Sequence, residues 1–352
     1  MAKKKICLMG RIYREGACDG QTIKTLEIYD ELVRRYGENN VGYLNYYGIR
    51  ISKPKCLVYP KLLLAISKVF LTSEKIIIAS NATSLPNLLK VCVMLNKFFK
   101  REMHFVLVGA ALAEGIDAHP EYKETLKHFK SIFVETETAR RELEVRGVDR
   151  LHVMPNFKTI RRFSLEEQPK EFKAPYKLIF MSRIVGLKGV SEMVRELKKI
   201  NANGVKYALD MYGMIDEEYA EEFAEIRKDL PEYIQYKGVA DAWKTTEIMH
   251  DYFLHVFPTK CATEGQPASI IDTFFAGTPV LSGRWNSCGE MIKEGVTGIS
   301  FELGNFDDFR EKLEYYYDHP EEIMALRAGC VKEAELFIPE NAISGLISEL
   351  ED

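Results

Sequence analysis

Residues 177–201 read KLIFMSRIVGLKGVSEMVRELKKIN and contain the signals of a strand, a loop and a helix in turn. The first six residues are too apolar on both faces for a half-exposed strand, which indicates a strand buried inside a parallel sheet. From residue 191 onward, apolar side chains recur at the spacing of an amphipathic helix. A buried strand followed by a helix is the repeating unit of parallel α/β sheets.

The same alternation runs along the whole chain. In the first half, strands are expected at residues 6–10, 41–44, 75–80, 104–109, 131–135 and 151–154. In the second half, they are expected at residues 177–182, 207–212, 233–238, 254–258, 279–282 and 299–303. Helical patterns lie between the strands. We therefore predict an α/β fold with two doubly wound, Rossmann-like lobes and a ligand-binding cleft between the carboxyl ends of their sheets.

The strand pattern is interrupted once, and the interruption marks a domain boundary. Residues 158–176 are rich in charge, contain Pro169 and Pro175, and show no strand pattern, as expected of a linker. The predicted N-terminal lobe therefore covers residues 1–157, and the predicted C-terminal lobe covers residues 177–335. A chain of 352 residues is long enough for each lobe to bury a core of its own.

Composition excludes several classes of protein. Apolar residues make up 46% of the chain and charged residues 28%, which is typical of a globular protein and not of a disordered or fibrous one. The seven cysteines are scattered and include no C-x-x-C pair, so we expect reduced thiols rather than disulfides or a zinc cluster. The first apolar run is too short for a signal peptide and no run is long enough for a spanning helix, which predicts a cytoplasmic protein.

Charge is distributed unevenly between the two halves. Residues 1–160 hold 26 Lys and Arg against 17 Asp and Glu, whereas residues 161–352 hold 22 against 35. An acidic half disfavours nucleic acid as a partner, and a basic half suits an anionic membrane surface or a phosphorylated ligand. The alternative is that the lysines only solvate the first lobe.

Two cations flank the loop that follows the strand at 177–182. Arg183 and Lys188 stand in the pattern Ser-Arg-(x)4-Lys-Gly, directly before a helix. The first turn of a helix offers unpaired N–H groups, and an arginine and a lysine beside it complete a site for a diphosphate. The alternative is that both residues are ordinary surface charges.

A second cluster follows the strand at 254–258. Residues 257–280 read FPTKCATEGQPASIIDTFFAGTPV, in which Glu264 precedes a helix and Asp272 lies within it. If Pro267 opens that helix, the N–H groups of residues 268–270 face an anion or sugar hydroxyls, and the two carboxylates bind hydroxyl groups. The alternatives are a helix-capping role for Glu264 and a solvated position for Asp272.

These motifs together resemble one enzyme family. The pattern acidic-Gly-(x)6-acidic before Ala-Gly-Thr-Pro-Val, preceded by Ser-Arg-(x)4-Lys-Gly and by Tyr212-Gly213, is similar to the group 1 glycosyltransferases, the large fourth family of retaining glycosyltransferases. Residues 20–25, GQTIKT, resemble the glycine loop and helix start of that family. Segments 133–137 and 154–157 resemble members that assemble bacterial capsule or exopolysaccharide. The resemblance implies the GT-B fold, with a helix at about 339–352 that packs back onto the first lobe.

The resemblance implies a role for each matching residue. Arg183 and Lys188 would hold the diphosphate of a nucleotide-sugar while Glu264 contacts its sugar, and these three are the expected catalytic residues. Asp272 replaces the second glutamate of the family and would bind the ribose with a shorter reach. The expected donor-binding residues are Gly20, Gln21, Gly213, Gly238, Val239, Gly265, Gln266, Pro267, Ala268, Ser269 and Asp272.

The acceptor side departs from the family. Many relatives carry a His-Asp pair after a strand of the first lobe, whereas residues 108–114 here read VGAALAE and contain no histidine. The candidate acceptor-side residues are therefore Gly109, Ala110, Glu114 and His119. The alternative is that His119 is an ordinary loop residue.

The resemblance also implies the course of the reaction. The leaving diphosphate takes the proton of the acceptor on the face from which it departs, so configuration is retained and protein cations stabilise the developing charge. No Asp-x-Asp pattern stands near an expected strand end. We therefore expect a retaining, hexosyltransferase-type enzyme that needs no metal and no other cofactor.

The predicted function is sugar transfer from a nucleotide-sugar donor to a glycan or lipid-linked saccharide in the synthesis of a cell-surface polysaccharide. A polyprenyl-linked acceptor would bring the first lobe to the anionic inner face of the plasma membrane. The expected contact is a helix whose basic residues are Lys90, Lys97, Lys100 and Arg101, unless it is a core helix with solvated lysines. Two other functions remain open: a nucleotide-sugar epimerase that uses no acceptor, and a non-catalytic nucleotide-sugar-binding partner of another transferase.

Overall fold

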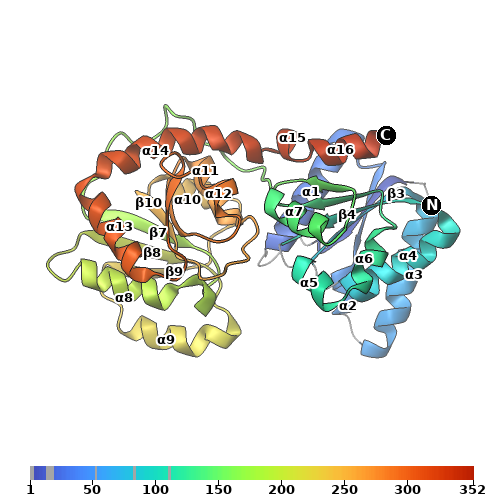
Figure 1. Ribbon diagram of the computed structural model, residues 1–352, viewed down its shortest axis with the longest axis horizontal. Helices are drawn as coiled ribbons and strands as arrows, with labels where there is room; N and C mark the ends of the chain where they lie inside the picture. Colours follow the sequence, from blue (N-terminus) through green and yellow to red (C-terminus); the bar gives the residue numbers. More distant parts are fainter. Residues whose placement is uncertain (1–3, 13–19, 52–53, 82–84, 110–111) are drawn as a thin grey trace. The chain divides into compact units, whose positions relative to one another are not determined.

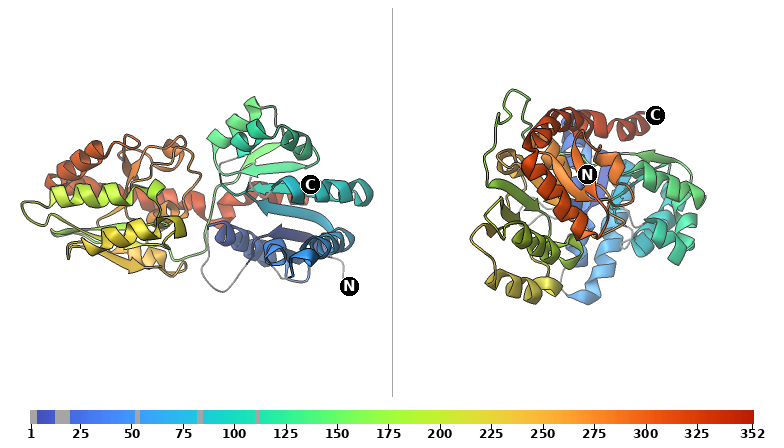
Figure 2. Two further views of the ribbon diagram at one scale, coloured as in Figure 1. Left: turned by 90° about the horizontal axis from the view of Figure 1, so that it is seen from below. Right: turned by 60° about the vertical axis from the view of Figure 1, so that its left-hand side comes forward.

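The computed structural model describes residues 4–12, 20–51, 54–81, 85–109 and 112–352, and the chain divides into two compact units. Unit 1 consists of Met1–Thr159 with Phe337–Asp352, and unit 2 consists of Ile160–Leu336 (Figure 1). In each unit the described residues form a parallel six-stranded sheet with helices on both faces, which Figure 2 shows from two further directions. The predicted α/β fold with two Rossmann-like lobes is confirmed.

The sheet of unit 1 has the strand order β2-β1-β3-β4-β5-β6, and its neighbouring strands pair in parallel. Its strands are β1 (Lys4–Gly10), β2 (Val41–Asn45), β3 (Ser73–Ser80), β4 (Glu102–Leu107), β5 (Ser131–Val134) and β6 (Leu151–Val153). The inner strands β1, β3 and β4 are almost wholly buried. Helices cover both of their faces, which explains why these strands are continuous apolar runs in the sequence.

The helices of unit 1 form one layer on each face of the sheet. They are α1 (Gly20–Tyr36), α2 (Tyr46–Arg50), α3 (Val58–Thr72), α4 (Leu85–Phe99), α5 (Leu112–Ala118), α6 (Glu121–Leu126), α7 (Glu137–Val145), α15 (Pro339–Ala342) and α16 (Ser344–Glu351). One apolar cluster contains Leu26 and Leu32 of α1 together with Leu346 of α16. Another contains Phe70 of α3 and Leu89 of α4. The last helix of the chain is therefore part of the core of unit 1.

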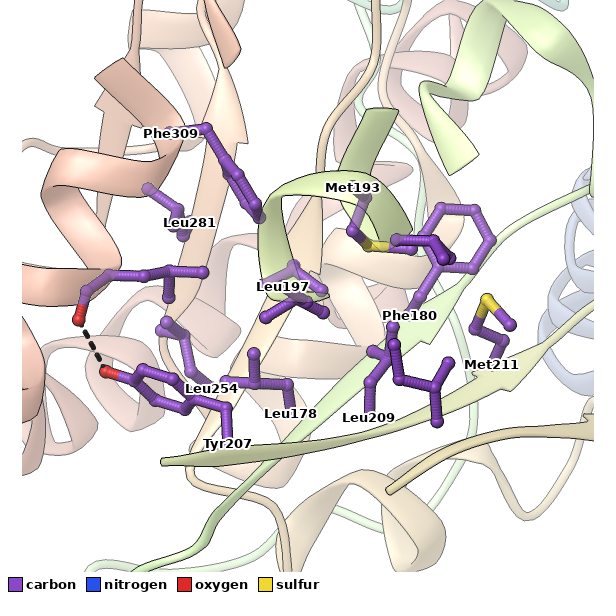
Figure 3. Close-up of a cluster of buried hydrophobic side chains, with 14 of the residues drawn as sticks. Leu178, Phe180, Met193, Leu197, Tyr207, Leu209, Met211, Leu254, Leu281 and Phe309 are labelled. Carbon is purple, nitrogen blue, oxygen red and sulfur yellow. Dashed lines mark hydrogen bonds between the residues drawn. The ribbon is translucent and has the colours of Figure 1, made fainter. Parts of the chain in front are cut away.

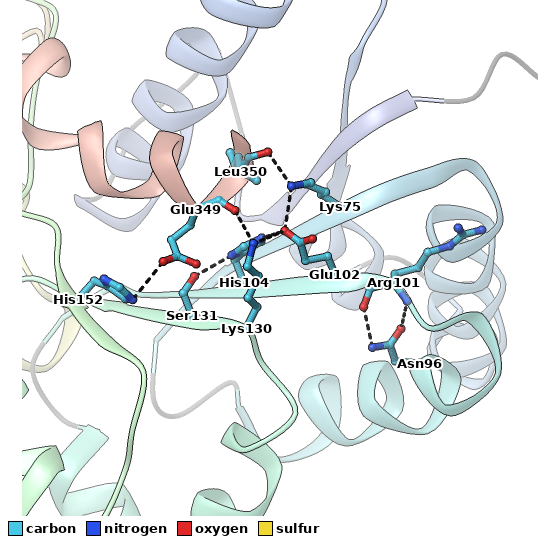
Figure 4. A network of polar contacts seen from close by, with 10 residues as sticks. All are labelled: Lys75, Asn96, Arg101, Glu102, His104, Lys130, Ser131, His152, Glu349 and Leu350. Carbon is cyan, nitrogen blue, oxygen red and sulfur yellow. Dashed lines mark hydrogen bonds and ion pairs between the residues drawn. The ribbon is translucent and has the colours of Figure 1, made fainter. Parts of the chain in front are cut away.

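Two lysines anchor α16 to the sheet of unit 1 (Figure 4). Lys75 Nζ donates to the carbonyl oxygen of Leu350 at 2.6 Å, and Lys130 Nζ donates to that of Glu349 at 3.0 Å. Both lysines also pair with Glu102, at 3.0 and 3.2 Å. Cations at the C-terminal end of a helix stabilise it because the last carbonyl groups carry partial negative charge.

The sheet of unit 2 has the strand order β12-β11-β10-β7-β8-β9, again with parallel neighbours. Its strands are β7 (Tyr176–Met181), β8 (Tyr207–Tyr212), β9 (Ile234–Gly238), β10 (Leu254–Phe257), β11 (Val280–Gly283) and β12 (Gly298–Phe301). Each predicted strand of this half is present, with ends that differ by about two residues at most.

The helices of unit 2 also cover both faces of its sheet. They are α8 (Val190–Ile200), α9 (Ala220–Lys228), α10 (Thr245–His250), α11 (Ala268–Ala276), α12 (Cys288–Met291), α13 (Phe306–Asp318) and α14 (Pro320–Glu333). Figure 3 shows a buried apolar cluster of unit 2, in which Phe180 of β7 lies near Met193 of α8 and Leu197 lies near Phe309. The hydroxyl of Tyr207 donates to the carbonyl oxygen of Leu313 at 2.7 Å, so this buried polar group is satisfied.

The segment expected to be a linker packs on unit 2. Residues 160–175, all of which are described, form neither helix nor strand. The N–H of Phe163 donates to the carbonyl oxygen of Phe275 at 2.8 Å. The buried guanidinium of Arg327 donates to Gln168 Oε1 at 2.9 Å. From residue 160 onward, the segment therefore belongs to unit 2.

Candidate functional site

The two predicted cations lie in the loop after β7, but their surroundings differ. The side chain of Arg183 is 62% exposed, and its Nη1 lies 3.9 Å from Asp216 Oδ2. Lys188 is largely buried, donates to Glu264 Oε1, and lies with its Nζ 4.6 Å from the centre of the Phe257 ring. Lys188 is therefore held in place, while Arg183 has room to meet a ligand.

Gly189 allows the loop after β7 to contact the loop after β10. Its φ is 66°, and a Cβ at this position would lie 2.2 Å from the carbonyl oxygen of Pro258. The N–H of Lys260 also donates to the carbonyl oxygen of Leu187 at 2.8 Å. A residue with a side chain would separate these loops, so the glycine of the Lys-Gly motif is required by close packing.

Glu264 lies on the loop between β10 and α11, with its carboxylate turned inward. Its Oε1 accepts hydrogen bonds from Thr259 Oγ1 at 2.7 Å and from Lys188 Nζ. The helix α11 has Pro267 as its N-cap, and among the described residues no side chain caps its first amides. The alternative that Glu264 caps this helix is therefore wrong.

The other predicted donor residues of this region surround the start of α11. Gly265 and Gln266 complete the loop, and Ala268 and Ser269 form the first turn, whose amides lack acceptors within the helix. Asp272 lies farther along the helix and is 2% exposed. The alternative that Asp272 is a solvated surface carboxylate is wrong.

The end of β8 lies between the ends of β7 and β9. The N–H of Gly213 donates to the carbonyl oxygen of Gly238 at 2.9 Å, and Val239 follows with an exposed side chain. A Cβ at Gly213 would lie 1.7 Å from the carbonyl oxygen of Ser182, next to Arg183. The structure therefore brings the predicted residues of unit 2 together along the carboxyl ends of neighbouring strands.

Of the predicted residues of unit 1, Gln21 and Gly109 lie near the carboxyl ends of strands. Gly20 and Gln21 begin α1, and Gln21 Oε1 accepts from Asn81 Nδ2 at 3.5 Å. Gly109 follows β4, whereas Ala110 lies outside the described residues. Glu114 is exposed on α5. The exposed ring of His119 stacks on Tyr122, with centroids 5.0 Å apart.

The sequence interpretation missed a buried ion pair in unit 1. Lys24 Nζ lies 2.9 Å from Glu135 Oε1 and donates to the carbonyl oxygen of Leu107 at 3.3 Å. The same carboxylate oxygen accepts the N–H of Gly109 at 3.1 Å. Burial lowers the pKa of Lys24, and the negative charge of Glu135 opposes that effect. The pair thus connects α1 to the ends of β4 and β5. Its only signal in the sequence was a carboxylate at the end of an expected strand.

An apolar and basic surface covers α3 and α4 of unit 1. These helices pack side by side, and Phe70 contacts Phe99 with ring centroids 5.9 Å apart. The exposed residues of this surface include Leu57, Tyr59, Lys61, Leu63, Leu64, Lys68, Leu71, Lys90, Met94, Lys97, Phe98 and the predicted Lys100. Arg101 was predicted to join it, but its Nε donates to the carbonyl oxygen of Phe70 at 2.9 Å and holds the two helices together.

Within the described ranges, no group of three or more His, Cys, Asp or Glu side chains is arranged to hold a metal ion. Among the helices that the structure describes, none combines the length and apolar character needed to cross a bilayer.

Comparison with known proteins gives a family match that lies within unit 2. Residues 175–319 match the sequence profile of the family described as Glycosyl transferases group 1. The chain carries a group 1 glycosyltransferase domain. The matched range contains Arg183, Lys188, Glu264 and Asp272, so the family match and the candidate site occupy the same unit. A search among curated proteins finds no significant match.

Solved structures share the fold of the whole chain. HepE from Anabaena in complex with UDP-glucose has a TM-score of 0.73 at 11% identity, with 98% of this chain and 99% of that chain covered. The lipopolysaccharide outer core galactosyltransferase WaaB in its apo form has a TM-score of 0.67 at 16% identity, with 98% and 99% covered. TarM from S. aureus, in a complex that contains UDP, has a TM-score of 0.66 at 17% identity. This chain is 83% covered in that match and spans 59% of the length of TarM.

The profile match confirms the predicted group 1 glycosyltransferase domain over residues 175–319, and the solved structures confirm the GT-B fold. The roles of individual residues are not tested by them and stay predictions.

Proposed function

We propose that the group 1 glycosyltransferase domain transfers a hexose from a UDP-sugar to a saccharide acceptor with retention of configuration. The observation that carries this proposal is the contact between Lys188 and Glu264 at the carboxyl end of the unit 2 sheet. It joins a cation suited to a diphosphate with a carboxylate suited to sugar hydroxyls. The choice of UDP is supported by the relatives HepE and TarM, whose solved complexes contain UDP.

In the proposed reaction, the acceptor oxygen bonds to C1 of the donor sugar while the bond from C1 to the phosphate oxygen breaks. The acceptor proton passes to the departing phosphate oxygen on the same face of the sugar. Lys188 and Arg183 stabilise the negative charge on the diphosphate, which is larger in the transition state than in the bound donor. Because protein cations supply this stabilisation, the reaction is proposed to need no metal ion.

The remaining donor contacts are assigned by their place around the same strand ends. The first-turn amides of α11, at Ala268 and Ser269, suit a phosphate or a sugar hydroxyl because they lack partners within the helix. Gly213 presents backbone without a side chain to the nucleotide. Asp272 is assigned to the ribose, and the acceptor is assigned to unit 1 near Gly109.

A nucleotide panel with a charge variant tests the donor assignment. We expect UDP to raise the melting temperature of the wild-type chain more than GDP, ADP or CMP does, because a ligand of the native state stabilises it. Lys188→Ala should lose most of the UDP shift, while Lys228→Ala, which breaks an exposed ion pair with Glu225, should keep it. Equal UDP shifts in both variants would contradict the donor site. Conversion of a UDP-sugar to its epimer without an acceptor would support the epimerase instead.

The surface over α3 and α4 supports a second part of the proposal, which is peripheral binding to an anionic bilayer. Leu64 and Phe98 are 71% and 82% exposed, which is unusual for large apolar side chains. Lys61 and Lys68 lie on the same face of α3 as Leu64, so apolar contact and attraction to anionic headgroups act together. This arrangement suits a lipid-linked acceptor at the inner face of the plasma membrane.

Liposome sedimentation tests the membrane part separately. We expect binding to vesicles of anionic lipid at low ionic strength and release as salt rises, since exposed charges are screened. Combined Lys61→Glu, Lys68→Glu and Lys97→Glu should abolish the binding and leave transfer to a soluble acceptor unchanged. A control with Lys198→Glu and Lys228→Glu in unit 2 should still bind. Equal sedimentation of the first variant and the wild type would contradict this part.

The proposed pathway is the synthesis of a cell-surface polysaccharide such as a capsule or exopolysaccharide. It is supported by the resemblance of segments 133–137 and 154–157 to such enzymes, and WaaB is a galactosyltransferase of the lipopolysaccharide outer core. The proposed acceptor is a glycan or a polyprenyl-linked saccharide.

A further inference from the structure

Thr259 lies two residues after the end of β10 and makes two hydrogen bonds with the loop that carries Glu264. Its side chain is fully buried. Its Oγ1 accepts the N–H of Cys261 at 3.2 Å and donates to Glu264 Oε1 at 2.7 Å. A hydroxyl has one proton, and a carboxylate can only accept, so the proton of Thr259 is committed to Glu264.

Both hydrogen-bond donors to this carboxylate reach the same oxygen. Among the residues that the structure describes, Thr259 Oγ1 and Lys188 Nζ both donate to Oε1. The carboxylate is therefore fixed in rotation, with Oε1 turned toward the protein. A second acceptor atom, Oε2, is left for a group that comes from outside.

The main chain of Glu264 is fixed as well. Ser287 Oγ donates to the carbonyl oxygen of Glu264 at 3.2 Å, and Trp285 Nε1 donates to Ser287 Oγ at 3.0 Å. Trp285 is buried edge-on against Phe257, with ring centroids 6.1 Å apart. The carbonyl group of Glu264 is thus held independently of Thr259. Loss of the threonine hydroxyl therefore removes one of the two donors to the carboxylate and leaves this anchor of the loop in place.

Donor binding changes which side chains orient the carboxylate of Glu264. If the diphosphate of the donor draws Lys188 away from Glu264, Thr259 remains as the described donor to Oε1. The orientation of the carboxylate in the bound state then depends on one hydroxyl.

We propose that Thr259 is a positioning residue that turns Glu264 so that Oε2 accepts a hydroxyl of the donor sugar, and that it thereby contributes to the choice of sugar. The inference rests on the proposed donor site and assigns one further residue to it. With Lys188 drawn to the diphosphate, an apolar side chain of the same shape at position 259 would leave the carboxylate of Glu264 free to rotate. A freely rotating acceptor discriminates poorly between sugars that differ in one hydroxyl.

Two variants of Thr259 separate positioning from packing. Thr259→Val keeps the shape and removes the hydroxyl, whereas Thr259→Ser keeps the hydroxyl. We expect Thr259→Val to lower kcat/KM for the preferred UDP-sugar by about tenfold to a hundredfold, the range for loss of a charge-assisted hydrogen bond. The ratio of kcat/KM between UDP-glucose and UDP-galactose should move toward one. Thr259→Ser should restore most of both quantities.

The dissociation constant of UDP separates positioning from packing, because a packing defect in the donor site would change it. UDP has no sugar to meet Glu264, so its affinity should stay within about twofold of wild type in Thr259→Val. Thr246→Val is the matched control, because Thr246 is also fully buried and its hydroxyl has no hydrogen-bond partner among the described residues. That control should leave kcat/KM unchanged.

The outcomes distinguish this inference from the proposed function. If the wild type binds UDP and transfers sugar but Thr259→Val equals it in kcat/KM, the inference is wrong and the donor site stands. The inference is also wrong if Thr259→Ser is as impaired as Thr259→Val, or if UDP affinity falls in parallel with kcat/KM. A wild type that neither binds UDP nor transfers sugar overturns the proposed function and the inference with it.

Discussion

Asp272 is the residue whose role can be tested most simply by kinetics. The resemblance to the group 1 glycosyltransferases implies a glutamate at this position in the family, and Asp272 is 2% exposed on α11. If it binds the ribose equally in the bound donor and in the transition state, Asp272→Asn should raise the donor KM by about tenfold and change kcat by less than about threefold. Steady-state kinetics over a range of donor concentrations measures both. An unchanged donor KM would remove Asp272 from the ribose site.

His104 makes the stability of unit 1 depend on pH. Burial lowers the pKa of His104 to about 4, although Glu102 beside it favours the charged form. In the unfolded chain the pKa is near 6.5, so between these values the unfolded state binds a proton that the native state does not. Stability is therefore complete above about pH 6.5 and is lost as the pH falls toward 4. This group should lower the free energy of unfolding by at most about 2 kcal/mol between pH 6.5 and 5.

Urea unfolding of the full chain at pH 7 and pH 5 checks this expectation. His104→Gln replaces the ring with a group that does not titrate, so the variant should lose less stability than the wild type over that range. Equal losses in the two proteins would show that the protonation of His104 does not limit stability.

At the scale of elements, the close approach of β7 and β8 sets a steric requirement. A Cβ at Gly213 would lie 1.7 Å from the carbonyl oxygen of Ser182, and φ of Gly213 is 153°. We expect Gly213→Ala to destabilise unit 2 by at least about 2 kcal/mol, because both the contact and the backbone conformation oppose a side chain. Gly289→Ala in α12 is the control, since nothing lies within 4 Å of its added Cβ. Chemical unfolding that finds both variants equally stable would contradict this packing.

The strands were predictable from the sequence because burial in a parallel sheet leaves a continuous apolar run. Residues 177–182 were predicted as a strand, and β7 covers Tyr176–Met181. The pairing of side chains was not predictable. Lys24 and Glu135 are 111 positions apart, and only the order of the strands brings them together. Thr259 and Glu264 are close in sequence, but the turn of the loop that joins their side chains is set by packing against Lys188 and Trp285.

The candidate site could likewise be predicted from the sequence only in part. Its residue types were read from motifs, since the chemistry of a diphosphate and of sugar hydroxyls selects cations and carboxylates. The motifs did not predict that Arg183 is exposed while Lys188 is buried, because exposure depends on how the loops after β7 and β10 pack. Arg101 was misassigned to the surface for the same reason, as its partner is a backbone carbonyl on another helix.

At the scale of the whole molecule, the chain returns to unit 1 after completing unit 2. Leu346, Ile347 and Leu350 of α16 are buried in the core of unit 1. Removal of residues 344–352 should therefore destabilise unit 1 by about 5 kcal/mol, from the apolar area that these side chains bury, while unit 2 keeps its own transition. Removal of the exposed pair Glu351–Asp352 should have little effect. Calorimetry or limited proteolysis reports the two units separately, and equal loss in unit 2 would contradict the division.

Proton NMR of the reaction in EDTA tests the central claim most directly. The wild-type chain is incubated with an α-linked UDP-hexose and a panel of saccharide acceptors, and the anomeric signals of donor and product are followed over time. We expect an α-linked product to appear as UDP is released in equal amount, without added metal, and Glu264→Gln to abolish the signal. A β-linked product, a donor converted to its epimer without transfer, or product that forms only after Mg²⁺ or Mn²⁺ is added would contradict the account.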